Sequence, residues 1–165
     1  MALKRGWQSR PVVVAAGAAL LVALLGGLMT DIGPWYRSLA QPPWKPPDWA
    51  FGPAWTLIYS LAAAAGVSGW RNLQGRVQRE TMLVLFSLNG FLNVLWSLLY
   101  FRLHRPDWAL LEVVLLWLSV LALIVLLAKD SPKSSWLLAP YLVWVAFAGA
   151  LNYATVQLNG PFGAG

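Results

Sequence analysis

Residues 108–128 read WALLEVVLLWLSVLALIVLLA, a run of 21 residues with one charged side chain, Glu112. A helix of about 20 apolar residues crosses the hydrocarbon core of a bilayer. Three more apolar blocks precede this one, at roughly 11–29, 53–70 and 81–101, and one follows it, at roughly 136–158. The sequence therefore predicts an all-α integral membrane protein, a single domain over residues 1–165 built as a bundle of five transmembrane helices.

The composition agrees with a lipid environment and excludes several other classes. Hydrophobic residues make up 59% of the chain and charged residues only 11%, whereas soluble domains carry about 25% charged residues. The formal net charge is +6, but the basic residues are scattered over short connections, which argues against nucleic acid as a partner. The absence of cysteine excludes a disulfide framework and any thiolate metal site.

The basic residues also predict an orientation. With five spans, the N-terminal segment and the second and fourth connections share one side of the membrane. That side carries eight Lys and Arg residues and the other side four. Because cytoplasmic loops are richer in Lys and Arg, the N-terminus is predicted to be cytoplasmic and the first loop to lie on the outer side.

No residue set supports a familiar catalytic or metal site. The chain has one His, no Cys and six carboxylates, most of them in connections. His104 lies in a turn between two Arg residues. Two interpretations are open: a pH-sensitive group, or a solvated loop histidine. Glu112 is the one carboxylate inside an apolar block. It is interpreted either as a proton or cation site, or as a group that faces the headgroups or a neighbouring helix end. We expect no bound metal and no cofactor, and a binding protein rather than an enzyme.

Aromatic residues gather in and after a proline-rich first loop, residues 30–52. Dense prolines, as in PPWKPP at 42–47, cannot continue a helix and predict an extended or turning chain. The aromatic residues at positions that no lipid belt requires are Trp35, Tyr36, Trp44, Trp49, Phe51, Trp55 and Tyr59. Trp55 and Tyr59 share a helix face, and Trp96 and Tyr100 repeat that spacing.

The last apolar block adds Trp144, Phe147, Ala148 and Leu151 as one stripe. Asn93, Asn152 and Tyr153 place hydrogen-bonding groups deep in apolar blocks, where an unpaired amide is costly and must find a partner. These residues either pack helices together or line a mostly apolar pocket with a few placed polar groups. Flat aromatic walls favour a planar hydrophobic ligand, and a lipid or sterol also fits this description.

Several stretches in order resemble the TspO/MBR family of tryptophan-rich sensory proteins and translocator proteins. They are WY at 35–36, PPWKPPDWAFGPAWTLIY at 42–59, LNVLW at 92–96, PYLVWVAF at 140–147 and LNY at 151–153. The resemblance extends from Gly27 to Asn159. It implies a five-helix bundle, commonly a homodimer, in a bacterial cell membrane, whose pocket under the first loop binds porphyrins such as protoporphyrin IX.

The resemblance also implies site residues and alternatives. The loop would be a lid, and the ligand-binding residues would be Tyr36, Trp44, Trp49, Phe51, Trp55, Asn93, Trp96, Trp144, Phe147, Ala148 and Leu151. The implied role is sensing, transport or disposal of porphyrins. Some bacterial members are reported to degrade protoporphyrin in light through paired tryptophans, a role that would fall on Trp55 and Trp144.

A lipid or sterol carrier is the remaining alternative. Sterol-binding members carry a Leu/Val, Tyr, Lys/Arg motif late in the fifth span. Here Tyr153 is followed by Gln157 and no basic residue, which disfavours sterol binding.

Overall fold

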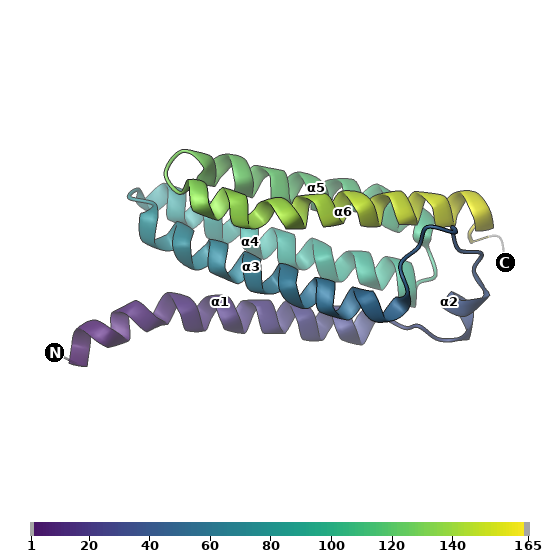
Figure 1. Ribbon diagram of the computed structural model, residues 1–165. Coiled ribbons are helices and arrows are strands. Elements are labelled where there is room, and N and C mark those ends of the chain that lie inside the picture. The colour runs from purple at the N-terminus through teal and green to yellow at the C-terminus, as the bar shows by residue number, and fades with distance from the viewer. Residues whose placement is uncertain (1, 164–165) are drawn as a thin grey trace.

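Five long helices lie side by side along one axis in the structure, a computed structural model that describes residues 2–163, with side chains from Arg10 onward (Figure 1). The long helices are α1 (Ala2–Met29), α3 (Phe51–Asn72), α4 (Arg76–Ser97), α5 (Pro106–Ala128) and α6 (Pro132–Asn159). A π-helical turn, η2 (Leu98–Arg102), continues α4. Each long helix, with η2 counted as part of α4, contains a segment long and apolar enough to cross a membrane. The predicted fold class is confirmed.

All five long helices begin earlier than their apolar blocks suggested, and the third and fifth spans show a local reason. The third span starts at Arg76, not at residue 81, because the Gly75 N–H donates to Gln78 Oε1 at 3.3 Å and so starts the helix in a polar segment. The fifth starts at Pro132, not at residue 136, with proline in the first turn. An apolar block marks the part of a helix inside the bilayer, but the helical backbone extends beyond it.

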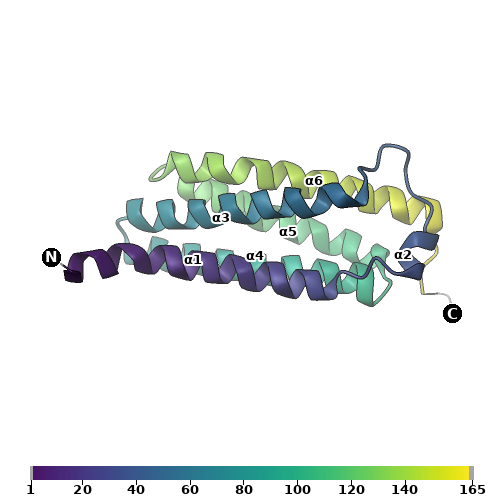
Figure 2. The same ribbon diagram turned by 60° about the horizontal axis from the view of Figure 1, so that its bottom comes forward.

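The helices form a ring that does not follow chain order. Going round the ring, α1 contacts α3, α3 contacts α6, α6 contacts α5, α5 contacts α4, and α4 returns to α1. Thus α1 lies against both α3 and α4 on the outside of the bundle (Figures 1 and 2). The α3–α4 and α5–α6 turns lie at one end, and the first loop and the C-terminal end of α6 at the other (Figure 1).

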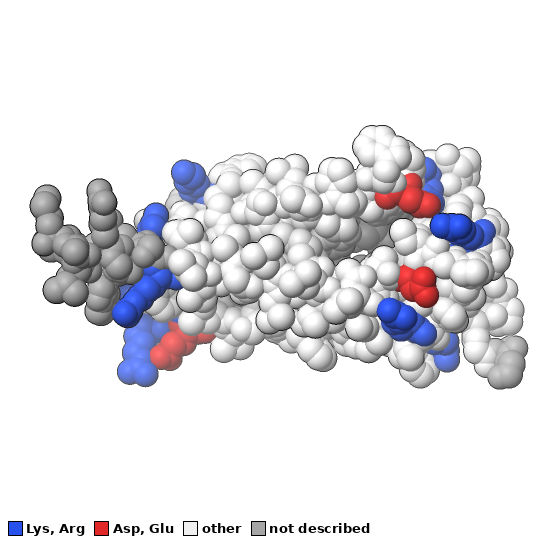
Figure 3. Space-filling view, turned by 90° about the horizontal axis from the view of Figure 1, so that it is seen from below, with Lys and Arg blue, Asp and Glu red and all other residues white. Residues whose placement is uncertain are grey.

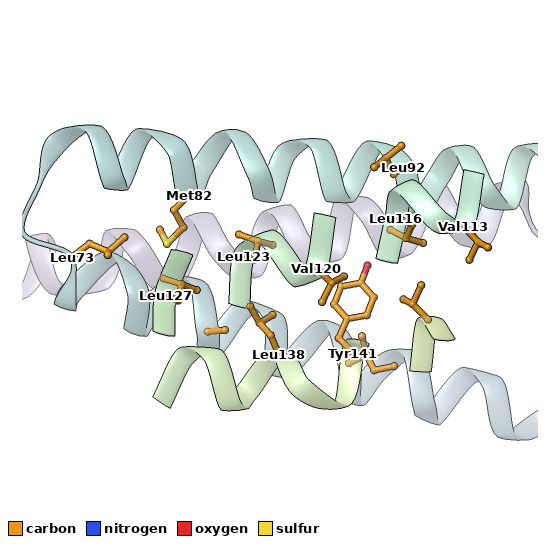
Figure 4. Close-up of a cluster of buried hydrophobic side chains, with 13 residues drawn as sticks. Leu73, Met82, Leu92, Val113, Leu116, Val120, Leu123, Leu127, Leu138 and Tyr141 are labelled. Atoms are coloured by element: carbon orange, nitrogen blue, oxygen red, sulfur yellow. The ribbon is translucent and has the colours of Figure 1, made fainter. Parts of the chain in front are cut away.

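A hydrophobic core extends through the bundle from the end with the α3–α4 and α5–α6 turns. Its fully buried members include Leu73, Met82, Leu123, Leu127 and Leu138 (Figure 4). Lipid tails are as apolar as these side chains, so the hydrophobic effect does not drive transmembrane helices together. Close packing of this kind holds them together instead. Tyr141 is buried within this core and directs its hydroxyl into the bundle (Figure 4).

The first loop covers the other end. It contains the short helix α2 (Pro34–Ser38) and the 3₁₀ turn η1 (Asp48–Ala50). The predicted loop range ends two residues too late, because Phe51 and Gly52 already belong to α3. Asn159 fastens the loop to α6: the Ala40 N–H donates to Asn159 Oδ1 at 2.7 Å, and Asn159 Nδ2 donates to the Ala40 carbonyl at 2.9 Å. The loop therefore has a defined position over the bundle.

Candidate functional site

A cavity of about 1000 Å³ lies between α1, α3, α4 and α6, beneath the first loop. The surface seen from the α1 side is hollowed near the loop end, and charged side chains gather at the two ends of this face but not in its middle (Figure 3). Small-molecule pockets in proteins have volumes of about 300–1,000 Å³. The cavity therefore has room for a large ligand.

Nine of the eleven predicted ligand-binding residues lie on the cavity wall: Tyr36, Trp49, Phe51, Trp55, Asn93, Trp96, Trp144, Ala148 and Leu151. Trp44 and Phe147 are not among its lining residues. They contact each other edge to face instead, with ring centroids 5.9 Å apart. On α6 the residues that face the cavity are Trp144, Ala148, Leu151, Asn152 and Thr155, and Phe147 is turned to one side.

One wall was not foreseen from the sequence. Helix α1 faces the cavity with small residues, Ala16, Ala19, Ala23 and Gly26, so the space next to it stays open. These positions are spaced by three and four residues, which places them on one helical face. That spacing was the available signal, but apolar small residues in a transmembrane block are equally typical of helix packing.

The aromatic walls come from three helices. Trp55 stacks on Tyr59 within α3, with ring centroids 5.3 Å apart and planes at 26°. Trp144 of α6 meets Trp55 edge to face at 6.3 Å and 85°. On α4 and its π-helical extension, Trp96 stacks on Tyr100 at 5.1 Å and 30°. The cavity thus offers flat, apolar ring surfaces on several sides.

A continuous chain of hydrogen bonds connects the cavity wall with the bundle interior. Tyr59 OH donates to Asn93 Oδ1 at 2.6 Å, and Asn93 Nδ2 donates to Tyr141 OH at 3.2 Å. Tyr141 OH donates in turn to Asn89 Oδ1 at 3.0 Å, and Asn89 Nδ2 to Ser119 Oγ at 2.8 Å. The chain crosses α3, α4, α6 and α5 and satisfies the amide groups that lipid leaves without partners.

Asn152, which also lines the cavity, forms a second set of polar contacts. With its amide oriented so that donors meet acceptors, it donates to the Pro106 carbonyl at 2.9 Å and accepts from the N–H groups of Leu110 and Trp96 at 3.0 and 3.3 Å.

The expectation for Tyr153, a polar group deep in an apolar block, was wrong. Its side chain is 55% exposed on the outer face of α6, because it follows Asn152 by one position and points away from the bundle.

For Glu112 the structure excludes one of the expected alternatives, a side chain that faces the headgroups. It does not face the headgroups: it is only 5% exposed, and neither carboxylate oxygen has a hydrogen-bond partner among the described residues. His104 is exposed, as expected for a loop histidine, but its ring stacks on Trp35 with centroids 4.0 Å apart. No group of three His, Asp or Glu side chains within the described part of the chain is placed to hold a metal ion.

Charged groups occur on the cavity wall only at the loop end, as far as the described residues go. Lys45 forms an ion pair with Asp48, Tyr36 OH donates to the same carboxylate at 3.3 Å, and the Lys45 ammonium lies 5.3 Å from the centre of the Tyr36 ring. Burial raises the pKa of Tyr36. Burial also acts to lower the pKa of Lys45, but hydrogen bonds to Asp48 and Tyr36 outweigh it, so this pKa is raised as well. Lys45 is therefore a cation at neutral pH.

Comparison with known proteins places the whole bundle in context. The sequence model of the TspO/MBR family matches residues 13–158. The chain is 35% identical to the tryptophan-rich protein TspO of Chlorobaculum tepidum over 159 residues, which cover 92% of this chain and 98% of the relative. It is 36% identical to the translocator protein of Bos taurus over 155 residues, 90% of this chain and 92% of the relative. A tryptophan-rich sensory protein of Cereibacter sphaeroides is 33% identical over 125 residues, 76% of this chain and 77% of the relative.

Proposed function

This chain belongs to the TspO/MBR family of integral membrane proteins, and on that premise we propose that it binds a porphyrin-type tetrapyrrole such as protoporphyrin IX between its helices. The binding would serve sensing, transport or disposal of porphyrins in a bacterial cell membrane. No cofactor is required for this role, since the porphyrin is the ligand.

The observation that carries the proposal is the combination of volume and wall chemistry in one cavity. A space of about 1000 Å³ accommodates a large ligand, and its walls present Trp55, Trp96 and Trp144. Aromatic rings prefer offset or edge-to-face contact with other rings. A planar conjugated macrocycle matches such walls better than a flexible lipid does.

Titration with protoporphyrin IX in the dark tests the proposal, with tryptophan fluorescence quenching as the readout. Trp144→Phe keeps an apolar ring but removes indole area, and we expect it to weaken binding roughly threefold to tenfold. Trp136→Phe is the matched control, because Trp136 is 77% exposed and does not line the cavity. The absence of saturable quenching by the wild-type protein would overturn the proposal.

Light-dependent degradation of protoporphyrin is a second candidate, favoured by the contact between Trp55 and Trp144 on the cavity wall. Both indoles would touch a porphyrin bound there. Aerobic illumination of the complex tests this activity: the porphyrin Soret band should be lost faster than for free porphyrin in the same detergent, and Trp55→Phe should slow the loss. Equal rates with and without protein would exclude the activity.

The lipid or sterol carrier is tested by competition: a sterol that fails to displace bound porphyrin would count against this alternative.

A further inference from the structure

The polar groups of the cavity are distributed unevenly along its length. Away from the loop, Tyr59 and Asn93 are engaged in the hydrogen-bond chain that leads to Tyr141. Wall hydroxyls are likewise engaged, each donating to the carbonyl four residues earlier in the chain: Thr30, Thr56, Ser60, Ser97 and Thr155. The buried indole N–H of Trp144 has no partner among the described residues, so it remains as a neutral donor in the interior of the cavity.

The loop end is different because it offers a cation. Lys45 is the only Lys or Arg among the described residues of the wall. Its side chain is 15% exposed, whereas the side chain of its partner Asp48 is 51% exposed. Lys45 is thus held beneath the loop against the cavity, and Asp48 lies on the solvent side of the pair.

A second donor lies on the same part of the wall. The side-chain amide nitrogen of Gln41 is covered and has no hydrogen-bond partner among the described residues. An amide N–H without a partner is costly to bury. Gln41 therefore has an unused donor on the cavity wall.

We propose that Lys45, supported by Gln41, is an anchor for a ligand carboxylate, so that the cavity selects planar amphiphiles with an acidic edge and holds that edge at the loop end. This inference rests on the proposed porphyrin binding and specifies its chemistry. Protoporphyrin IX has this shape, since both of its propionate groups lie on one edge of an otherwise apolar ring. A neutral planar ligand or a sterol lacks the group that Lys45 would bind.

In this arrangement Asp48 occupies the place of the ligand carboxylate when the cavity is empty. Binding exchanges one ion pair for another: the ligand carboxylate takes a hydrogen bond from Lys45, and Asp48 turns to water. The Asp48 side chain is already 51% exposed, so its carboxylate is partly hydrated before the exchange. Its separation from Lys45 therefore costs little free energy. Asp48 therefore competes with the ligand.

The test compares protoporphyrin IX with its dimethyl ester, which has the same ring but no carboxylate. Both are titrated against detergent-purified wild type, Lys45→Gln, Lys45→Arg, Asp48→Asn and Lys133→Gln, with the Soret shift as readout. The measured quantity is the ratio of the diacid Kd to the ester Kd in one detergent. Comparing this ratio between variants cancels the different partition of the two ligands into micelles.

We expect Lys45→Gln to reduce the preference for the diacid about fivefold, the effect of one ion pair at a partly exposed site, with little change for the ester. Lys45→Arg should keep the preference. Lys133→Gln should also keep it, because this exposed lysine lies at the opposite end of the bundle and its loss changes the net charge equally. Asp48→Asn should tighten diacid binding.

An unchanged ratio in Lys45→Gln overturns the inference and leaves porphyrin binding intact. Failure of both ligands to bind wild type overturns the proposed function together with the inference. If Lys45→Gln does not fold, as judged by circular dichroism, the Asp48→Asn variant decides: unchanged or weaker diacid binding contradicts the exchange.

Discussion

Tyr59 of α3 donates a 2.6 Å hydrogen bond to the side-chain oxygen of Asn93 of α4, although these two helices contact each other less than either contacts α1. Both residues line the cavity. Through Tyr141 and Asn89 the same chain of hydrogen bonds continues to α5 and α6. The shape of the cavity is thus coupled to polar contacts that hold four helices together.

Tyr141→Phe should destabilise the bundle. The hydroxyl of Tyr141 accepts from Asn93 and donates to Asn89. Its removal therefore takes one hydrogen bond from each of these two buried amide groups. We expect a loss on the order of 1–2 kcal/mol in the free energy of unfolding, measured by SDS titration and circular dichroism. Tyr153→Phe is the control and should change nothing, since Tyr153 faces outward. Equal stability of the two variants would contradict the role of the chain.

Asn159→Ala should release the first loop from α6. Both hydrogen bonds between Asn159 and Ala40 are lost, and the loop should open more often. We expect cleavage by trypsin after Arg37 to become roughly tenfold faster, since Arg37 is exposed and Lys45 is protected by the proline that follows it. Gln157→Ala, an exposed change on the last turns of α6, is the control. Unaltered cleavage would mean that other contacts hold the loop.

The preference for a carboxylate ligand should not vary between about pH 6.5 and 9. Lys45 has a raised pKa, so its ammonium keeps the proton above the ordinary lysine value of about 10.4, and the neighbouring Tyr36, whose pKa is also raised, stays neutral in this range. Asp48 is the carboxylate that faces Lys45. The diacid-to-ester Kd ratio, measured in half-unit pH steps, checks this. A decline between pH 7 and 8 would point to a different cation.

Glu112→Met should raise the stability of the protein. The carboxylate of Glu112 is buried without a hydrogen-bond partner among the described residues, and such a group costs free energy that an apolar side chain of similar volume does not. We expect an increase in unfolding temperature of a few degrees, roughly 2–4 °C for about 1 kcal/mol, and unchanged porphyrin affinity. Lower stability would show that the carboxyl makes a favourable contact in the membrane.

The N-terminus should lie in the cytoplasm and the first loop outside. The chain contains no cysteine, so single substitutions report accessibility without background. Ser38→Cys in the loop should react with an impermeant maleimide in intact cells. Gln74→Cys in the α3–α4 turn, at the other end of the bundle, should react only after the membrane is permeabilised. The reverse pattern would invert the predicted orientation.

The amino-acid sequence by itself determined the five spans and the all-α fold. Both are local properties: a bilayer requires about 20 apolar residues and a backbone that satisfies its own hydrogen bonds. The repeated i, i+4 spacing also indicated which aromatic residues share a helix face, as for Trp55 and Tyr59. Nine predicted site residues accordingly lie on one cavity wall.

Only the tertiary structure decided which faces meet. Periodicity does not specify the neighbour of a helix, so the position of α1 between α3 and α4 and its small-residue wall could not be read from spacing. For the same reason Phe147 turned aside from the cavity, Tyr153 pointed outward and Glu112 was buried. The pairing of Lys45 with Asp48 depends on the fold of the loop over the bundle. Burial and partners are properties of two surfaces in contact, and a single sequence describes each surface alone.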